Sequence, residues 1–176
     1  MSTTTSDDQL AEIRRRIDRL QAFAQAGPAE NSPRIRRHLD TLHREASIVA
    51  EAPEAPDHVD EKVGQLKTRL AVAENSVVAD NSDDWTTFAR AVEDELRSWD
   101  TYLERLQTTA ATKDGNARER AEAAIADVRT RRIAVHDRLA QAHKNVNGAW
   151  HEQRNHVSAA RDELERKADE LPAKVK

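Results

Sequence analysis

The chain has 176 residues and a formal net charge of −4; 34% of its residues are charged and 3% are aromatic. Cysteine is absent, which excludes disulfides and thiolate chemistry. This composition is typical of long helices and coiled coils, and it argues against a large core and against a strongly basic, nucleic-acid-binding surface. Because the sequence has no signal-peptide pattern and no apolar run near the roughly 18–20 residues of a membrane span, we expect a cytoplasmic protein.

Apolar residues recur at alternating spacings of three and four along most of the chain. This heptad pattern predicts helices at about residues 7–26, 33–51, 58–79, 83–112 and 117–171, and no stretch is typical of a strand. Capping signals mark several of the predicted helix starts. They are Ser6 with Gln9, Ser32 before Pro33, Ser82 with Asp83 and Asp84, and Asn116 with Glu119.

Turn-forming residues separate the predicted helices. Gly27 and Pro28 end the first helix, the segment 52–57 (APEAPD) interrupts the second, and Asp114 with Gly115 forms a turn. The segment 145–148 (NVNG) is rich in poor helix formers, so the helix 117–171 is either continuous or broken there.

A short motif occurs twice, as IDRLQ at 17–21 and LERLQ at 103–107, with an offset of 86 residues. The apolar register of the two regions also matches at this offset, which favours an internal duplication over chance similarity between heptads. We therefore predict an all-α fold of elongated antiparallel helical hairpins in a coiled-coil bundle, with two tandem repeats. The expected organisation is a disordered tail at 1–6, a first hairpin at 7–80 interrupted near 52–57, and a longer second hairpin at 82–171.

The second region resembles a loose family of small bacterial coiled-coil proteins that are often described as stress-associated. The matching features are Trp99, the stretch LERLQTTA at 103–110, the Arg/Ala-rich stretch ARERAEAAIADVRTRR at 117–132, and Trp150. The resemblance covers 84–170 well and 10–78 weakly. It implies a helical hairpin without enzymatic activity, and it supplies no catalytic residue.

Candidate chemical sites in the sequence are weak. HEQRNH at 151–156 is similar to the zinc motif H-E-x-x-H, but its histidines are five apart and point about 140° away from each other on a helix. His136 and His143 share a face but lie about 10.5 Å apart along it. The basic runs at 14–16, 34–37 and 129–132 have acidic neighbours, which indicates charged helix faces. We therefore predict no catalytic residue, no metal and no cofactor.

The sequence favours a non-enzymatic structural or interaction protein that self-associates or binds a protein partner along apolar helix faces. If the helix 117–171 is unbroken, its end outruns the preceding helix and leaves Val157, Ala160, Leu164 and Leu171 without a local partner, which predicts a homo-oligomer, most simply a dimer. Nucleic acid is an unfavoured partner, and a phasin-like coat on lipid or polymer granules is the alternative function. The predicted structural interface residues are Leu96, Trp99, Leu103, Leu106, Ile125, Val128, Val135, Leu139, Trp150 and Leu164. Trp150 is assigned equally to the core or to a partner surface.

Overall fold

The computed structural model describes residues 6–51, 56–145 and 149–175, and the regular structure within these ranges is entirely helical. The helices are α1 (Ser6–Gln25), α2 (Pro33–Glu51), α3 (Pro56–Asn81), α4 (Trp85–Ala111), α5 (Gly115–Lys144), α6 (Trp150–Ala168) and α7 (Leu171–Val175), with a 3-10 turn at Pro28–Asn31. The all-α prediction is confirmed. Of the predicted tail at 1–6, residues 1–5 lie outside the described residues, and Ser6 already belongs to α1.

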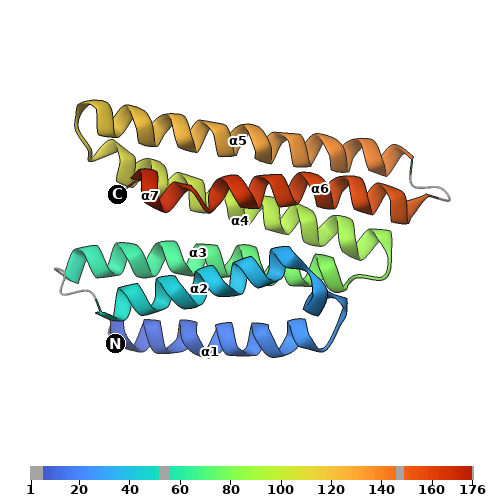
Figure 1. Ribbon diagram of the computed structural model, residues 1–176, viewed down its shortest axis with the longest axis horizontal. Helices are drawn as coiled ribbons and strands as arrows, with labels where there is room; N and C mark the ends of the chain where they lie inside the picture. The colour runs from blue at the N-terminus through green and yellow to red at the C-terminus, as the bar shows by residue number, and fades with distance from the viewer. Residues whose placement is uncertain (1–5, 52–55, 146–148, 176) are drawn as a thin grey trace, which may run out of the picture.

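The helices form two halves that lie side by side (Figure 1). In the first half, α1, α2 and α3 pack on one another; in the second, α5 packs on both α4 and α6, and α7 packs against α5. The halves meet where α3 packs on α4, and hydrogen bonds from Arg34 to Ser158 and Asp162 join α2 to α6. The centre of the molecule is therefore a four-helix arrangement of α2, α3, α4 and α6.

Of the two alternatives for residues 117–171, the continuous helix is wrong. The chain leaves helical structure after Lys144, and α6 begins at Trp150 and packs back along α5; residues 146–148 lie outside the described residues. Val157, Leu164 and Leu171 are consequently buried inside the chain, and Ala160 packs against the same core. The apolar end of this segment therefore has partners within the chain and does not by itself predict a homo-oligomer.

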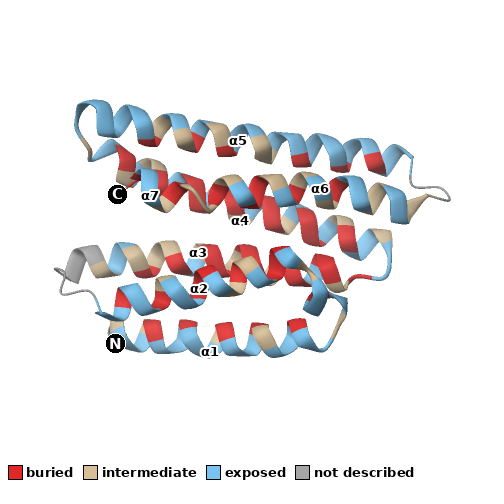
Figure 2. Ribbon diagram, viewed as in Figure 1, coloured by how far each residue is buried: buried red, intermediate tan, exposed pale blue. Residues whose placement is uncertain are grey.

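The molecule has two apolar cores. The first core lies among α1, α2 and α3 and includes Ile13, Leu42 and Leu70. The second is formed by α4 to α7 together with Val72 and Ala79 of α3. Figure 2 shows the buried positions on the inward sides of the helices, while the outer side of α5 is exposed.

Helix starts agree with the sequence at some positions and differ at others. Ser32 Oγ accepts a hydrogen bond from the Ile35 amide at 3.4 Å, as expected of an N-cap before a first-turn proline. In contrast, α4 is capped by Asp84, which accepts from the Thr87 amide at 2.9 Å, and not by Ser82. The predicted cap at Asn116 is also wrong, because α5 already begins at Gly115, whose φ of 48° favours glycine.

Gly27 lets the turn after α1 approach the end of α3 closely. A Cβ at this position would lie 2.5 Å from Asn81 Oδ1, the atom that accepts a 2.8 Å hydrogen bond from the Ala29 amide. The Gly-Pro sequence therefore ends α1 and also allows Asn81 to fix the α1–α2 turn against α3.

Candidate functional site

Charged and polar side chains line the boundary between the halves, beside apolar contacts such as those of Val72 and Ala79 of α3 in the second core. The positions repeat at helical spacing: Arg34 and His38 on α2, Ser76 and Asp80 on α3, Arg161 and Glu165 on α6. All are at most 8% exposed. We call the following set the buried charge network: Arg34, His38, Arg69, Ser76, Asp80, Glu95, Arg161 and Glu165.

Arg161 of α6 organises one end of the network. Its guanidinium donates to Glu95 of α4 at 2.5 and 2.9 Å, to Asp80 of α3 at 2.9 Å, and to the Ser76 hydroxyl at 3.0 Å. Asp80 also accepts from Arg34 of α2 at 2.8 Å, so one carboxylate holds arginines from both halves. Burial acts to raise the pKa of Asp80, but Arg161 and then Arg34 outweigh it and hold that pKa well below its usual range.

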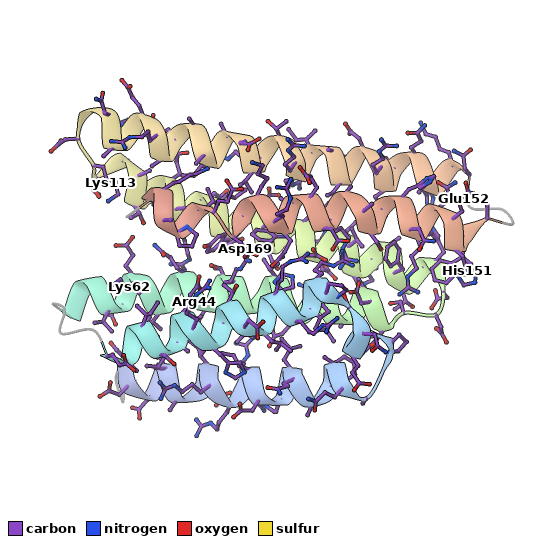
Figure 3. The ribbon with its side chains drawn as sticks, viewed as in Figure 1. Arg44, Lys62, Lys113, His151, Glu152 and Asp169 are labelled. Atoms are coloured by element: carbon purple, nitrogen blue, oxygen red, sulfur yellow. The ribbon has the colours of Figure 1, made fainter. Side chains whose placement is uncertain are left out.

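Arg69 of α3 organises the other end. It donates to Glu165 of α6 at 2.9 Å and to Asp169, just beyond α6, at 2.6 Å. Its guanidinium lies 4.5 Å from the ring centroid of Trp99, a cation–π contact that is stronger for being desolvated. Figure 3 places Asp169 in the space between the two layers of helices.

His38 completes the Arg69 end. Its Nε2 lies 2.8 Å from Glu165 Oε2, within ion-pair distance, and the two groups form a charge pair when the imidazole is protonated. Burial raises the pKa of Glu165, but Arg69 and then His38 outweigh it and lower that pKa to about 2. This carboxyl is ionised throughout the neutral range.

A second arginine of α6 binds the carboxyl end of α3. Arg154 donates to the backbone carbonyls of Ser82, Asp80 and Ala79 at 2.6, 2.7 and 3.3 Å. The last carbonyls of a helix lack intrahelical partners, and a cation there complements the helix dipole. The same guanidinium lies over the rings of Phe88 and Trp150, so it also covers the aromatic end of the second core.

The predicted interface residues lie inside the molecule. Leu96, Trp99, Leu103, Leu106, Ile125, Val128, Val135, Leu139 and Leu164 are all buried in the second core. Trp150 is partly buried and contacts Phe88 edge to face, with ring centroids 6.4 Å apart. The structure thus places these residues where they pack the chain on itself.

No family model, no curated protein and no solved structure matches this chain.

The histidines and basic runs that were candidates for metal or phosphate binding are distributed over α1, α2, α5 and α6. His151 and His156 are both exposed on α6, and within the ranges that the structure describes no three acidic or histidine side chains are grouped to hold a metal ion. In the run at 34–37, predicted to be a charged helix face, Arg36 is exposed and Arg37 partly so, whereas Arg34 is 4% exposed and pairs with Asp80 and Asp162. None of the described helices has the length and apolar character of a membrane span.

The buried charge network was missed from the sequence, although a signal was present. On α6 the residues Arg154, Arg161 and Glu165 lie at heptad-related spacings beside the apolar stripe of Val157 and Leu164. A charged stripe beside an apolar stripe indicates a helix that packs on two sides, one apolar and one charged. Chemically, the network places guanidinium groups against carboxylates and thereby holds four helices in register; it presents no activated nucleophile.

A shallow hollow lies on the outer surface of the first half, between α1 and α3. It has a volume of about 390 Å³ and is lined by Arg16, Arg19, Leu20, Phe23, Glu74 and Val78. Phe23 is 52% exposed and Val78 is 40% exposed, so apolar side chains of both helices face solvent here. At its rim Arg16 pairs with Glu74 at 2.6 Å and Arg19 pairs with Glu12 at 2.8 Å.

Proposed function

We propose that this protein is a non-enzymatic interaction protein that self-associates through the hollow between α1 and α3. The observation that carries the proposal is the pair of large apolar side chains, Phe23 and Val78, exposed side by side on adjoining helices. Exposed apolar patches of this kind mark interaction sites on folded proteins. The ion-paired interior supports the non-enzymatic part, because its carboxylates face arginines.

Charge and area favour a second copy of the chain as the occupant. The rim carries two bases, Arg16 and Arg19, and two acids, Glu12 and Glu74, so these four charges balance. A two-fold contact can exchange these partners between copies. Helix α1 is about 30 Å long, and two helices span about 20 Å, which offers about 600 Å² on each copy. The total of about 1,200 Å² is at the lower limit for a stable dimer, so we expect a weak one.

Sedimentation equilibrium from low to high micromolar concentration tests the proposal. We expect the mean mass to rise from one chain towards two, and the thermal midpoint to rise with concentration, because assembly stabilises the folded chain by mass action. Phe23→Ser should weaken the association at least about tenfold, which equals about 1.4 kcal/mol. The matched control is Ile133→Ser, since Ile133 is 55% exposed on α5, away from the hollow.

A monomer at every concentration would contradict the proposal, and so would equal effects of the two substitutions. The alternative function, a coat on lipid or polymer granules, needs apolar stripes that face the granule. In this fold the stripes face the two cores, which favours the interaction function. Co-sedimentation with anionic liposomes distinguishes the two: binding that requires loss of tertiary structure would support the coat.

The stress association is also part of the proposal, and the resemblance of 84–170 to stress-associated hairpin proteins is its support. The measurement is the abundance of the protein in its own cells before and after heat, osmotic and oxidative stress. Unchanged abundance in all three conditions would contradict it.

We further propose that the two halves are diverged copies of one three-helix unit. Helices α1 and α4 end at Gln25 and Ala111, 86 residues apart, the offset of the RLQ motif. The residues buried in α1 match buried residues of α4 at the same offset: Leu10 with Leu96, Ile13 with Trp99, Ile17 with Leu103, Leu20 with Leu106, and Ala24 with Ala110. If so, α1–α3 expressed alone should show helical circular dichroism and a cooperative melt, and an unstructured fragment would count against a shared unit.

A further inference from the structure

Helix α4 packs on α3 through four side chains spaced along one of its faces. They are Ser98, which accepts from Asn75 at 3.2 Å; Tyr102, whose ring centroid lies 5.7 Å from the Arg69 guanidinium; Arg105, which lies against Gly64; and Thr109, which accepts from Gln65 at 3.1 Å. This contact joins the two halves within one chain, and it provides a reference for the corresponding faces of the other helices.

The corresponding face of α1 is the one that the hollow between α1 and α3 leaves uncovered. At the offset of 86 residues that aligns the buried positions of α1 and α4, the four contact positions correspond to Glu12, Arg16, Arg19 and Phe23. Arg16, Arg19 and Phe23 line the hollow, and Glu12 pairs with Arg19 at its rim. The first half therefore presents to solvent the face that the second half buries against α3.

Helix α6 likewise leaves uncovered the face that α3 buries against α4. Core positions of α3 and α6 align at an offset of 94 residues: Val63 with Val157, Leu66 with Ala160, Leu70 with Leu164, and Val77 with Leu171. At this offset Gln65 and Arg69, which contact α4, correspond to Ala159 and Glu163. Ala159 is exposed, and the Glu163 side chain is 35% exposed. The face of α6 that is equivalent to the α4-binding face of α3 is therefore accessible.

A second shallow hollow lies on α5, where the boundary face of α2 has its equivalent. Buried positions of α2 and α5 also align at 86 residues: Ile35 with Ala121, Leu42 with Val128, and Val49 with Val135. Arg34 and His38, which pair with α6 across the boundary, then correspond to Arg120 and Ala124. Both of these line a hollow of about 530 Å³ between α5 and α7. Figure 1 places α5 at the edge of the molecule opposite to α1.

We propose that the outer face of α5 and α6, defined by Arg120, Ala124, Ala159 and Glu163, binds the hollow between α1 and α3 of a second copy of the chain. The contact repeats, between copies, the packing of the second half on the first half within one chain. Because the two surfaces differ, the arrangement is head to tail, and each bound copy keeps one free surface for the next. The inference rests on the proposed self-association through the hollow and names the surface that fills it; a two-fold contact places hollow against hollow instead.

Charge and size at the two surfaces support this register. The α3–α4 pairs, transferred at the two offsets, become Ala159 with Phe23, Ser158 with Arg19, Glu163 with Arg16, and Asp169 with Glu12. Glu163 and Arg16 attract each other, and Ala159 is small enough to leave room for the exposed ring of Phe23. The last pair has like charges, but Arg69 already pairs with its aspartate at 2.6 Å within the chain.

Sedimentation equilibrium of full chains that each lack one surface tests the proposal. Phe23→Ser disables the hollow, and Ala159→Arg disables the α6 face because the long side chain occupies the space that the ring needs. Each variant alone should self-associate at least about tenfold more weakly than the wild type. An equimolar mixture should form a heterodimer with wild-type affinity that grows no further, since each variant still has one intact surface. The matched control is Ala140→Arg, at an exposed position of α5 outside both surfaces, which should associate as the wild type does.

Charge reversal provides a second test that does not depend on side-chain size. Arg16→Glu and Glu163→Arg should each weaken the self-association, because like charges then meet at the contact. A mixture of the two variants should recover it, since the reversed charges face each other between copies. In a two-fold contact, Glu163→Arg should associate as the wild type does. Far-UV circular dichroism at low concentration checks that each variant keeps its helices.

The outcomes separate this inference from the proposed function. Wild-type association of Ala159→Arg, together with weakened association of Phe23→Ser, would overturn the head-to-tail contact and leave self-association through the hollow in place. A mixture that stays monomeric although both variants are weakened would also overturn it, because the two surfaces would then not meet. A wild type that is monomeric at every concentration would overturn both.

Discussion

Leu42 in the first apolar core and Arg161 in the buried charge network are almost equally inaccessible, with exposed fractions of 0% and 1%. Different forces hold them. Leu42 is stabilised by apolar burial, which is non-directional and depends on area and packing. Arg161 has lost its hydration, and its stability depends on hydrogen bonds to Glu95, Asp80 and Ser76 with the correct geometry.

This difference assigns different roles to the two regions. The apolar cores supply most of the stability of each half, because burial scales with apolar area. The network contributes less net free energy, since desolvation of the charges offsets most of their attraction. Its directional contacts instead fix how α2, α3, α4 and α6 are placed relative to one another. The network thus determines how the two halves are placed relative to each other, whereas apolar packing stabilises each half.

The largest expected effect comes from removing one charge of the network. Arg161→Met should reduce the free energy of unfolding by about 3–5 kcal/mol, because it leaves Asp80 and Glu95 buried without their shared cation. Chemical denaturation measures the loss. The control is Arg166→Met, which breaks an exposed pair with Glu163 and should change stability by about 1 kcal/mol or less. Similar losses in the two variants would mean that the network is no more than a set of surface pairs.

A cavity in an apolar core should have a comparable but slightly smaller effect. Leu103→Ala, at a position 1% exposed in the second core, should cost about 2–5 kcal/mol. Because no charge changes, this cost should be the same at pH 4 and pH 7, whereas the cost of Arg161→Met should shrink at the lower pH. A strongly pH-dependent cost for Leu103→Ala would blur the distinction between the two regions.

The acid limb of the stability curve should come from the network. Arg69 and His38 lower the pKa of Glu165 from 4.5 to about 2, and the pKa of Asp80 is lowered as well. A lowered pKa means that the stabilisation is complete above the unfolded value and is lost as pH falls towards the folded one. We expect a loss on the order of 2 kcal/mol between pH 4.5 and pH 2. In Glu165→Gln this limb should be smaller; an unchanged limb would assign it to other carboxyls.

A helix cap outside both regions sets the lower end of the scale. Asp84→Ala removes the side-chain acceptor of the Thr87 amide at the start of α4 and should cost about 1 kcal/mol. Ser82→Ala distinguishes the observed cap from the one expected from sequence, because the Ser82 hydroxyl bonds the Val78 carbonyl and not the start of α4. If Ser82→Ala cost more than Asp84→Ala, the cap assignment would be reversed.

Local signals in the sequence predicted the helices well. Heptad spacing identified α1 to α4 to within a few residues, since each of these helices buries an apolar stripe, although α3 also places Val72 and Ala79 in the second core. The sequence does not predict whether the helix breaks before Trp150, because NVNG weakens a helix without ending it. The break lets Val157 and Leu164 pack against the rest of the second core. That packing involves residues distant in sequence, which a local pattern does not encode.

Local sequence patterns do not predict the buried charge network, for a related reason. Arg34 and Asp80 lie 46 positions apart, and Arg69 and Glu165 lie 96 apart, so neither pair is visible as a helical i,i+4 spacing. A charged residue such as Arg161 is usually exposed, and only its partners on α3 and α4 make burial tolerable. Pairing across four helices therefore became apparent only when the helices were assembled.

The most direct test of the account is a double-mutant cycle between Arg161 and Glu95, with Arg161→Met, Glu95→Gln and the combined variant measured by urea unfolding at neutral pH. These side chains come from α6 and α4, and they share two hydrogen bonds in the interior. The account predicts a coupling free energy above about 1 kcal/mol, within the range for buried contacting residues. Additivity within about 0.3 kcal/mol would contradict it.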